Sequence, residues 1–199
     1  MDVNKLSIQE FLSLGYVFLL LLGISYQTIY FSFFDINYLK YSSILDVLLS
    51  PLQVMTENII ILGTFLFIIL FAVLYVKTFG RKLYQWQRRQ GWYKKFFNVE
   101  RWDKMWAKEN SNSFAILYTG ILILIIFIEF GFIFGSRMSS LMESGKLEIR
   151  HEIVFVDAEE KSVRILNQNS LYLFYVVENE NKLTISPIDG NIKKISKLK

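Results

Sequence analysis

"FAILYTGILILIIFIEFGFIFG", the stretch from Phe114 to Gly135, decides the fold of this chain because its only charged residue is Glu129. A helix rises about 1.5 Å per residue, so about 20 apolar residues are enough to cross the hydrocarbon core of a bilayer. A helix buried in a soluble bundle would carry a polar stripe, and this stretch has none. We therefore expect a membrane-spanning helix here.

Two earlier stretches have the same character. Residues 11–34 contain no charge, and the stretch that begins at residue 54 carries Glu57 near its start. The first stretch has no small-residue cleavage site after it, so we expect an uncleaved anchor instead of a signal peptide. The sequence thus predicts an α-helical membrane protein whose transmembrane domain, residues 1–136, has three spans near 11–34, 54–78 and 114–135.

The distribution of basic residues predicts how the chain is oriented. The loop at residues 80–110 holds nine Lys and Arg against three acids, whereas the loop before the second span offers only Lys40. Short loops rich in Lys and Arg stay on the cytoplasmic side of a membrane. We expect the N-terminus and this loop in the cytoplasm of a bacterium, the spans in its inner membrane, and the C-terminal part outside the cytoplasm.

The basic loop also contains all four tryptophans of the chain. After Gly91 the aromatic residues recur at steps of three and four, which favours an amphipathic helix lying among anionic lipid headgroups. Docking of a cytoplasmic protein partner at 80–110 is a second interpretation. Nucleic-acid binding uses the same residue types, but a loop tethered at both ends to spans is ill suited to it, so we expect no nucleic acid. The residues expected at this interface are Trp86, Arg88, Arg89, Trp92, Lys94, Lys95, Trp102 and Trp106.

A short helix is expected between the first two spans. Ser42 or Ser43 can cap it, and Pro51 should end it near Ser50. Its apolar face would lie on the outer membrane surface, although a re-entrant segment is an alternative. That face consists of Ile44, Leu45, Leu48 and Leu49.

Residues 137–199 change to mixed charge and strand-forming residues, which predicts a small β unit after a stalk at 137–146. Asp, Asn and Gly between the strands are typical of tight turns. Residues 170–177 are apolar on both faces, as in a central strand of a small sheet or open barrel. A unit this small is near the lower limit for folding alone, so it should lean on the spans or on copies of itself. The expected strands are 146–156, 162–166, 170–177, 182–186 and 191–196.

Polar residues inside the expected spans are the main candidates for function. A bare carboxylate in lipid is costly, so Glu129 should face a partner, a water-filled cavity or the bundle interior. The polar groups either line a path for an ion, a proton or a small ligand, or they hold the helices together by hydrogen bonds. The members of this cluster are Glu129, Glu57, Thr64, Ser25, Gln27 and Thr28.

Gly131 and Gly135 form a GxxxG motif in the third expected span. Small residues four apart let two helices approach closely, and the motif is known from helix dimers. Glu129 lies about 200° around the helix from Gly131, so the acid and the glycines face different ways. We expect the glycine face to pack against another helix and to be available to a neighbouring subunit of a homo-oligomer.

The residue types argue against an enzyme. The chain has no cysteine, which excludes disulfides, thiolate metal sites and cysteine nucleophiles. Its one histidine, His151, has no second ligand beside it and is read as an exposed strand residue. No acid, base and nucleophile converge, so we expect no catalytic residue, no metal and no cofactor.

Two stretches carry a resemblance. "FFDINYLKYSSILDVLLSPL", from Phe33 to Leu52, resembles a pattern in uncharacterised small multi-span membrane proteins of bacteria. "VRILNQNSLYLFYVVENENKLTISPIDGNIKKI", from Val163 to Ile195, is similar to their short strand-rich C-termini. The resemblance covers roughly half of the chain and implies no activity, but some small multi-span proteins of this general build are membrane components of antiphage systems.

These observations lead to one preferred functional hypothesis. We expect a non-enzymatic, oligomeric membrane sensor or effector subunit that forms or gates a polar path in antiphage defence or stress. The alternative is an accessory or scaffold subunit of a transporter or envelope complex.

Overall fold

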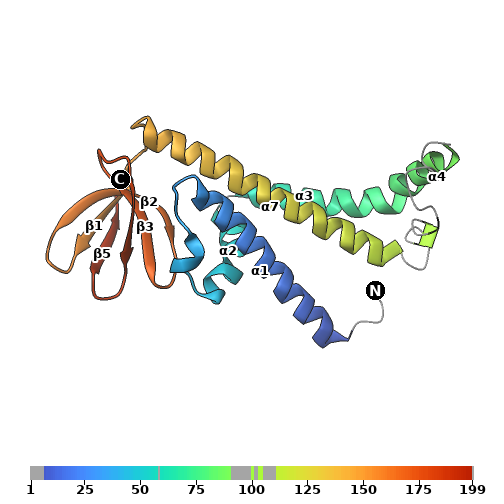
Figure 1. The fold of residues 1–199 in the computed structure, drawn as a ribbon, viewed down its shortest axis with the longest axis horizontal. Helices are drawn as coiled ribbons and strands as arrows, with labels where there is room; N and C mark the ends of the chain where they lie inside the picture. The colour runs from blue at the N-terminus through green and yellow to red at the C-terminus, as the bar shows by residue number, and fades with distance from the viewer. Residues whose placement is uncertain (1–6, 58, 91–99, 101–102, 105–110, 199) are drawn as a thin grey trace. The chain divides into compact units, whose positions relative to one another are not determined.

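The computed structural model describes residues 7–57, 59–90, 100, 103–104 and 111–198. Most of the described chain is helical, and a small antiparallel sheet lies at the C-terminus (Figure 1). Three helices are long and apolar enough to cross a membrane, namely Ile8–Ser32, Ile61–Gly80 and Ala115–Glu143. The expected number of long apolar helices is therefore confirmed.

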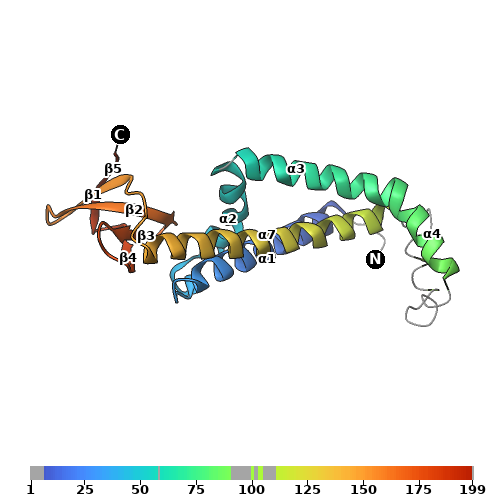
Figure 2. The same ribbon diagram turned by 90° about the horizontal axis from the view of Figure 1, so that it is seen from above.

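The chain divides into two compact units, residues 1–18 with 52–126 and residues 19–51 with 127–199. The first unit contains α3 (Ile59–Leu74), the π-helical segment η3 (Tyr75–Gly80) and α4 (Arg81–Arg89). Figure 2 shows α4 leaving the end of α3 at an angle. The wider turn of a π-helix is one way to bend a helical path.

Helices α1 (Ile8–Ser32) and α7 (Ser111–Glu143) each begin in the first unit and end in the second, and within the second unit they pack through the glycines of α7. A Cβ atom added to Gly131 would lie 2.9 Å from the carbonyl oxygen of Tyr26, and one added to Gly135 would lie 2.8 Å from that of Tyr30. Residue numbers rise together along the two helices, so they run parallel.

Helix α2 (Ile44–Glu57) begins as the sequence predicts, but its end differs. Ser43 and Asp46 form a capping box in which Ser43 N donates to Asp46 Oδ2 at 2.9 Å and Asp46 N donates to Ser43 Oγ at 3.1 Å. The prediction that Pro51 ends the helix is wrong, because Pro51 lies inside it. Pro51 is fully buried, and this packing offsets the hydrogen bond that the proline cannot donate.

The apolar face of α2, which the sequence predicts to lie on a membrane surface, does not pack inside the protein. Ile44, Leu45 and Leu49 are exposed, whereas Val47 and Ser50 are buried. Gly23 of α1 is the reason, because a Cβ atom there would lie 1.9 Å from the carbonyl oxygen of Val47. The two backbones are in direct contact, so α2 turns its small side toward α1 and leaves its large apolar side chains on the surface.

The C-terminal sheet has five antiparallel strands in the order β4-β3-β2-β1-β5. Only residues 188–191 connect β4 to β5, which lie at opposite ends of this order. The connection is a tight turn, since Ile192 N donates to Ile188 O at 3.1 Å, so it cannot span a flat sheet about 4.8 Å wide per strand. The sheet must curl, as in the expected open barrel. The strands are β1 (His151–Phe155), β2 (Glu160–Gln168), β3 (Tyr172–Val177), β4 (Leu183–Pro187) and β5 (Ile192–Lys197).

Two boundaries before the sheet differ from the expected ones. Helix α7 continues to Glu143 instead of ending near Gly135, so most of the expected stalk is helical. It ends in a Schellman motif, in which Lys146 N donates to Leu141 O at 3.0 Å and Gly145 has a φ of 64°. Strand β1 then begins at His151 and not at Lys146.

The sheet uses both of its faces. One face holds its own core, made of Ile153, Phe155, Val163, Leu173 and Tyr175. On the other face, Phe174 and Val176 are also buried. Both faces of β3 are therefore apolar, as predicted, and β3 lies between β2 and β4 inside the sheet.

The contact between Gly23 and Val47 yields a prediction. Gly23→Ala should lower the free energy of unfolding by about 1–3 kcal/mol, because the new methyl group overlaps the Val47 carbonyl. Gly15→Ala in the same helix is the matched control, since nothing lies within 4 Å of a Cβ atom there. The control should be neutral or stabilising by up to about 1 kcal/mol. Thermal unfolding in detergent measures both, and equal midpoints would contradict the close approach.

Candidate functional site: the junction between sheet and helices

The second face of the sheet packs against the end of α1 and the 3-10 helix η2 (Tyr38–Tyr41). The ring of Phe174 lies 4.9 Å from that of Phe31 and 5.4 Å from that of Tyr38, measured between centroids. Phe31 and Tyr38 stack on each other at 4.8 Å. We call this contact, together with the polar bonds around it, the junction. It buries the aromatic face that a sheet of this size cannot cover alone.

Asp46 is the polar centre of the junction. Its carboxylate caps α2 through Ser43, whose Oγ donates to Oδ2 at 2.6 Å. The same carboxylate accepts from the turn between β2 and β3, where Ser170 N donates to Oδ1 at 3.0 Å and Ser170 Oγ donates to Oδ2 at 2.9 Å. One side chain therefore fixes both the start of α2 and the position of the sheet.

Two asparagines, Asn167 near the end of β2 and Asn169 in the turn after it, add further bonds. Asn167 Nδ2 donates to Gln27 Oε1 of α1 at 3.3 Å, and Asn169 Nδ2 donates to Tyr41 O of η2 at 2.8 Å. Asn169 Oδ1 also accepts from Leu171 N, which closes the turn. Strand β2 consequently runs to Gln168, two residues beyond its expected end.

The electrostatics of the junction favour the charged form of Asp46. Burial alone would raise the pKa of this carboxyl group, but the hydrogen bonds from Ser43 and Ser170 outweigh burial and hold the pKa below its ordinary value of 3.8. An ionised carboxylate has the acceptor sites for all these donors. The junction is thus a directional connection that depends on one negative charge.

The polar residues predicted inside the spans differ in burial. Gln27 is buried and belongs to the junction, Ser25 is half-buried, and Thr28 and Glu129 are exposed. Thr64 lies half-buried in α3 of the first unit. The side chain of Glu57 falls outside the described residues.

The glycine motif has a partner within the chain. Gly131 and Gly135 are both buried, and their neighbours are Tyr26, Ile29, Tyr30 and Phe33 of α1. The expected close helix packing is present, but α1 of the same chain covers this face. The glycines are therefore not available to a neighbouring subunit.

Part of the basic loop can be placed. Trp86, Arg88 and Arg89 are exposed on α4. Arg88 pairs with Asp103 at 2.9 Å, and the Tyr84 hydroxyl donates to the same carboxylate at 2.6 Å. The other expected interface residues, Trp92, Lys94, Lys95, Trp102 and Trp106, lie outside the described residues.

His151 is half-buried, so the expectation that it is an exposed strand residue is wrong. Burial lowers its pKa first, and the nearby charges of Arg164, Lys197 and Arg150 lower it further. Its neutral form is therefore favoured near neutral pH. Within the described residues, no group of three His, Asp or Glu side chains could hold a metal ion.

Comparison with protein families, curated proteins and solved structures finds no match. The functional argument therefore depends on the residues and contacts of this chain.

The pH dependence of Asp46 gives a second prediction. Because its pKa is lower in the folded chain than in the unfolded chain, its contribution to stability is complete above pH 3.8 and is lost as the pH falls through the folded-state pKa. Asp46→Asn should destabilise the protein at pH 7 by about 0.5–2 kcal/mol, since an amide offers one acceptor oxygen and turns its NH2 group toward donors.

Thermal unfolding in detergent from pH 7 to pH 3 measures this effect. The difference between parent and variant should shrink toward pH 3. Asp189→Asn, at an exposed turn, is the control and should follow the parent at every pH. An Asp46→Asn variant as stable as the parent at pH 7 would show that the junction does not depend on this charge.

Proposed function

We propose that this chain is an integral protein of the bacterial inner membrane and a non-enzymatic sensor or effector subunit of a homo-oligomer. In this proposal the three apolar helices span the bilayer, and the C-terminal sheet lies outside the cytoplasm. The sheet receives a signal or a load, and the junction passes it to the helices. A role in antiphage defence or stress rests on the resemblance described above.

The composition of the long helices supports the membrane placement. Exposed Phe, Leu and Ile side chains cover α3, where Leu66, Phe67 and Leu70 are each more than half exposed. Such a surface is costly in water and favourable in lipid. The orientation rests on the basic residues of the 80–110 loop, and the parallel course of α1 and α7 agrees with it.

The observation that carries the proposal is the junction. Asp46 joins the turn before β3 to the first turn of α2, and Asn167 joins the end of β2 to α1. Hydrogen bonds to a charged group are among the stronger polar contacts in proteins. A displacement of the sheet would therefore move the outer ends of α1 and α2, which is what a sensor needs.

The exposed position of Glu129 supports assembly. If α7 spans the membrane, an exposed carboxyl group on it would face lipid in a single subunit, at a considerable cost. A second copy that brings its own polar groups to this face would remove that cost. Any polar path would then run between subunits along the Glu129 face, and not through one subunit.

The orientation can be tested directly. A reporter fused after Lys199 that is active only outside the cytoplasm should be active, and one fused within the 80–110 loop should be inactive. The reason is the excess of Lys and Arg in that loop. Cytoplasmic activity of the C-terminal reporter would overturn the three-span orientation.

Single cysteines can test assembly because the chain has none of its own. Ile133→Cys lies one turn from Glu129 and is exposed, so it should crosslink to its copy in membranes. Leu66→Cys, exposed on α3, is the control and should crosslink much less. Equal, weak crosslinking at both positions would argue for a monomer and favour the alternative of an accessory or scaffold subunit.

Glu129→Gln separates the two roles considered for this residue. If the carboxyl group only joins subunits, the amide should preserve both the Ile133→Cys crosslink and any cation flux into liposomes. If it lines a cation path, the crosslink should persist while flux is lost.

A further inference from the structure

Two arginines lie close together at one end of the sheet. Arg164 is in β2, and Arg150 directly precedes β1. The ladder between these strands ends at the pair of His151 with Val163, and Arg150 N still donates to Val163 O at 3.3 Å. The charge of Arg150 acts on Arg164, and like charges placed close together repel each other.

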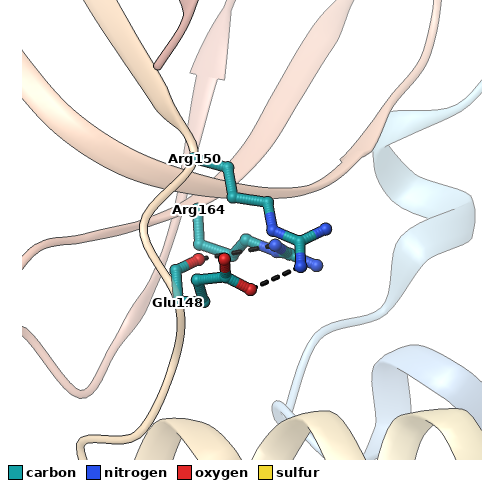
Figure 3. A network of polar contacts seen from close by, with 3 residues as sticks. All are labelled: Glu148, Arg150 and Arg164. Carbon is teal, nitrogen blue, oxygen red and sulfur yellow. Dashed lines mark hydrogen bonds and ion pairs between the residues drawn. The ribbon is translucent and has the colours of Figure 1, made fainter. Parts of the chain in front are cut away.

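One carboxylate partly balances this pair. Glu148 forms an ion pair with Arg150, and its backbone oxygen accepts from Arg164 Nη1 at 3.4 Å. Figure 3 shows the two guanidinium groups extending beside Glu148. Glu152 lies further along β1, but within the described part of the chain Glu148 is the one acid that pairs with either arginine. The cluster therefore keeps an excess of positive charge and unused guanidinium donors.

The cluster lies on the face of the sheet that meets the helices. Arg164 pairs across the ladder with the buried Val176, and it is close enough to Tyr30 of α1 for that side chain to influence its pKa. Burial and the charge of Arg150 lower the pKa of Arg164. Tyr30 belongs to the last turns of the first candidate span, so the arginines sit where a span would leave the bilayer.

We propose that Arg150 and Arg164 form a binding site for a phosphate group, with Glu148 as a competing internal anion. Two guanidinium groups side by side can donate several parallel hydrogen bonds to the oxygens of one phosphate. A phosphodiester carries a single negative charge, which would balance the excess of the cluster. The phosphate belongs either to an anionic lipid headgroup of the outer leaflet or to a free anion.

The lipid source rests on the proposed membrane placement, whereas binding of free phosphate does not. In the first case the sheet would monitor the headgroups beside its own helices. The cluster and the junction lie on one face of the sheet. A bound phosphate group would therefore affect the contact between the sheet and α1.

The test uses the full chain in nanodiscs and in neutral detergent. In nanodiscs of phosphatidylcholine with phosphatidylglycerol, native mass spectrometry counts the lipids retained by the protein. The double variant Arg150→Gln/Arg164→Gln should retain phosphatidylglycerol at least about tenfold more weakly, because it loses both charged groups that donate to the phosphate. Lys193→Gln/Lys194→Gln removes the same charge from exposed positions of β5 and should retain the lipid as the parent does.

Glu148→Gln gives the opposite sign. Removing the competing carboxylate should strengthen retention of phosphatidylglycerol, which a purely structural role for Glu148 would not produce. In detergent, inorganic phosphate should raise the thermal midpoint of the parent above that in chloride at equal ionic strength. If phosphate raises the thermal midpoint of the parent but not that of the arginine variant, the site also binds free phosphate. If only lipid retention differs between the two, the site binds the lipid headgroup alone.

Two results would overturn the inference. One is equal loss of phosphatidylglycerol in the arginine and lysine variants, which would indicate diffuse attraction to a basic surface. The other is an arginine variant that binds both probes like the parent. A chain that fails to float with liposomes would instead refute the membrane placement, and the phosphate arm in detergent would still decide the site.

Discussion

The second unit depends on how closely the backbone of α1 can be approached. Gly23 admits the carbonyl of Val47 from α2, and the glycines of α7 admit the backbone of α1 at Tyr26 and Tyr30. At each of these glycines, a side chain larger than a hydrogen atom would overlap the neighbouring helix. Once α1 is held between these two neighbours, its last turns present Gln27 and Phe31 to the sheet. The junction is therefore a consequence of tight helix packing below it.

Much of the fold could be predicted from the sequence because its signals are periodic and local. Apolar runs identify the long helices, and alternation with turn residues identifies all five strands. Ser43 and Asp46 are three residues apart, so the helix cap between them is also a local signal. The errors occur where burial overrides a local rule, as at Pro51, or where a helix continues into polar sequence, as α7 does to Glu143.

The candidate site could not be predicted in the same way. Asp46 has two roles, and only the capping of α2 can be recognised from neighbouring residues in the sequence. Its bonds to Ser170 join residues that are 124 positions apart, and no spacing rule connects them. Conversely, Glu129 attracts attention as a charge in an apolar run, yet the structure leaves it exposed on α7. A charged residue in an apolar run shows where burial in lipid would be costly. The fold, however, determines which other residues contact that charge.

The order of synthesis gives the parallel packing of α1 and α7 a further consequence. The partners of the end of α1 are made late, since Gln27 bonds to Asn167 across 140 positions and Phe31 meets Phe174. While the ribosome adds these residues, Gln27 and Phe31 of α1 lack these two partners. Long-range contacts of this kind form slowly and leave partly folded chains open to wrong partners. For this protein the last strands cover the end of the first helix, so a chain released early would keep α1 without the sheet residues that pack against its last turns.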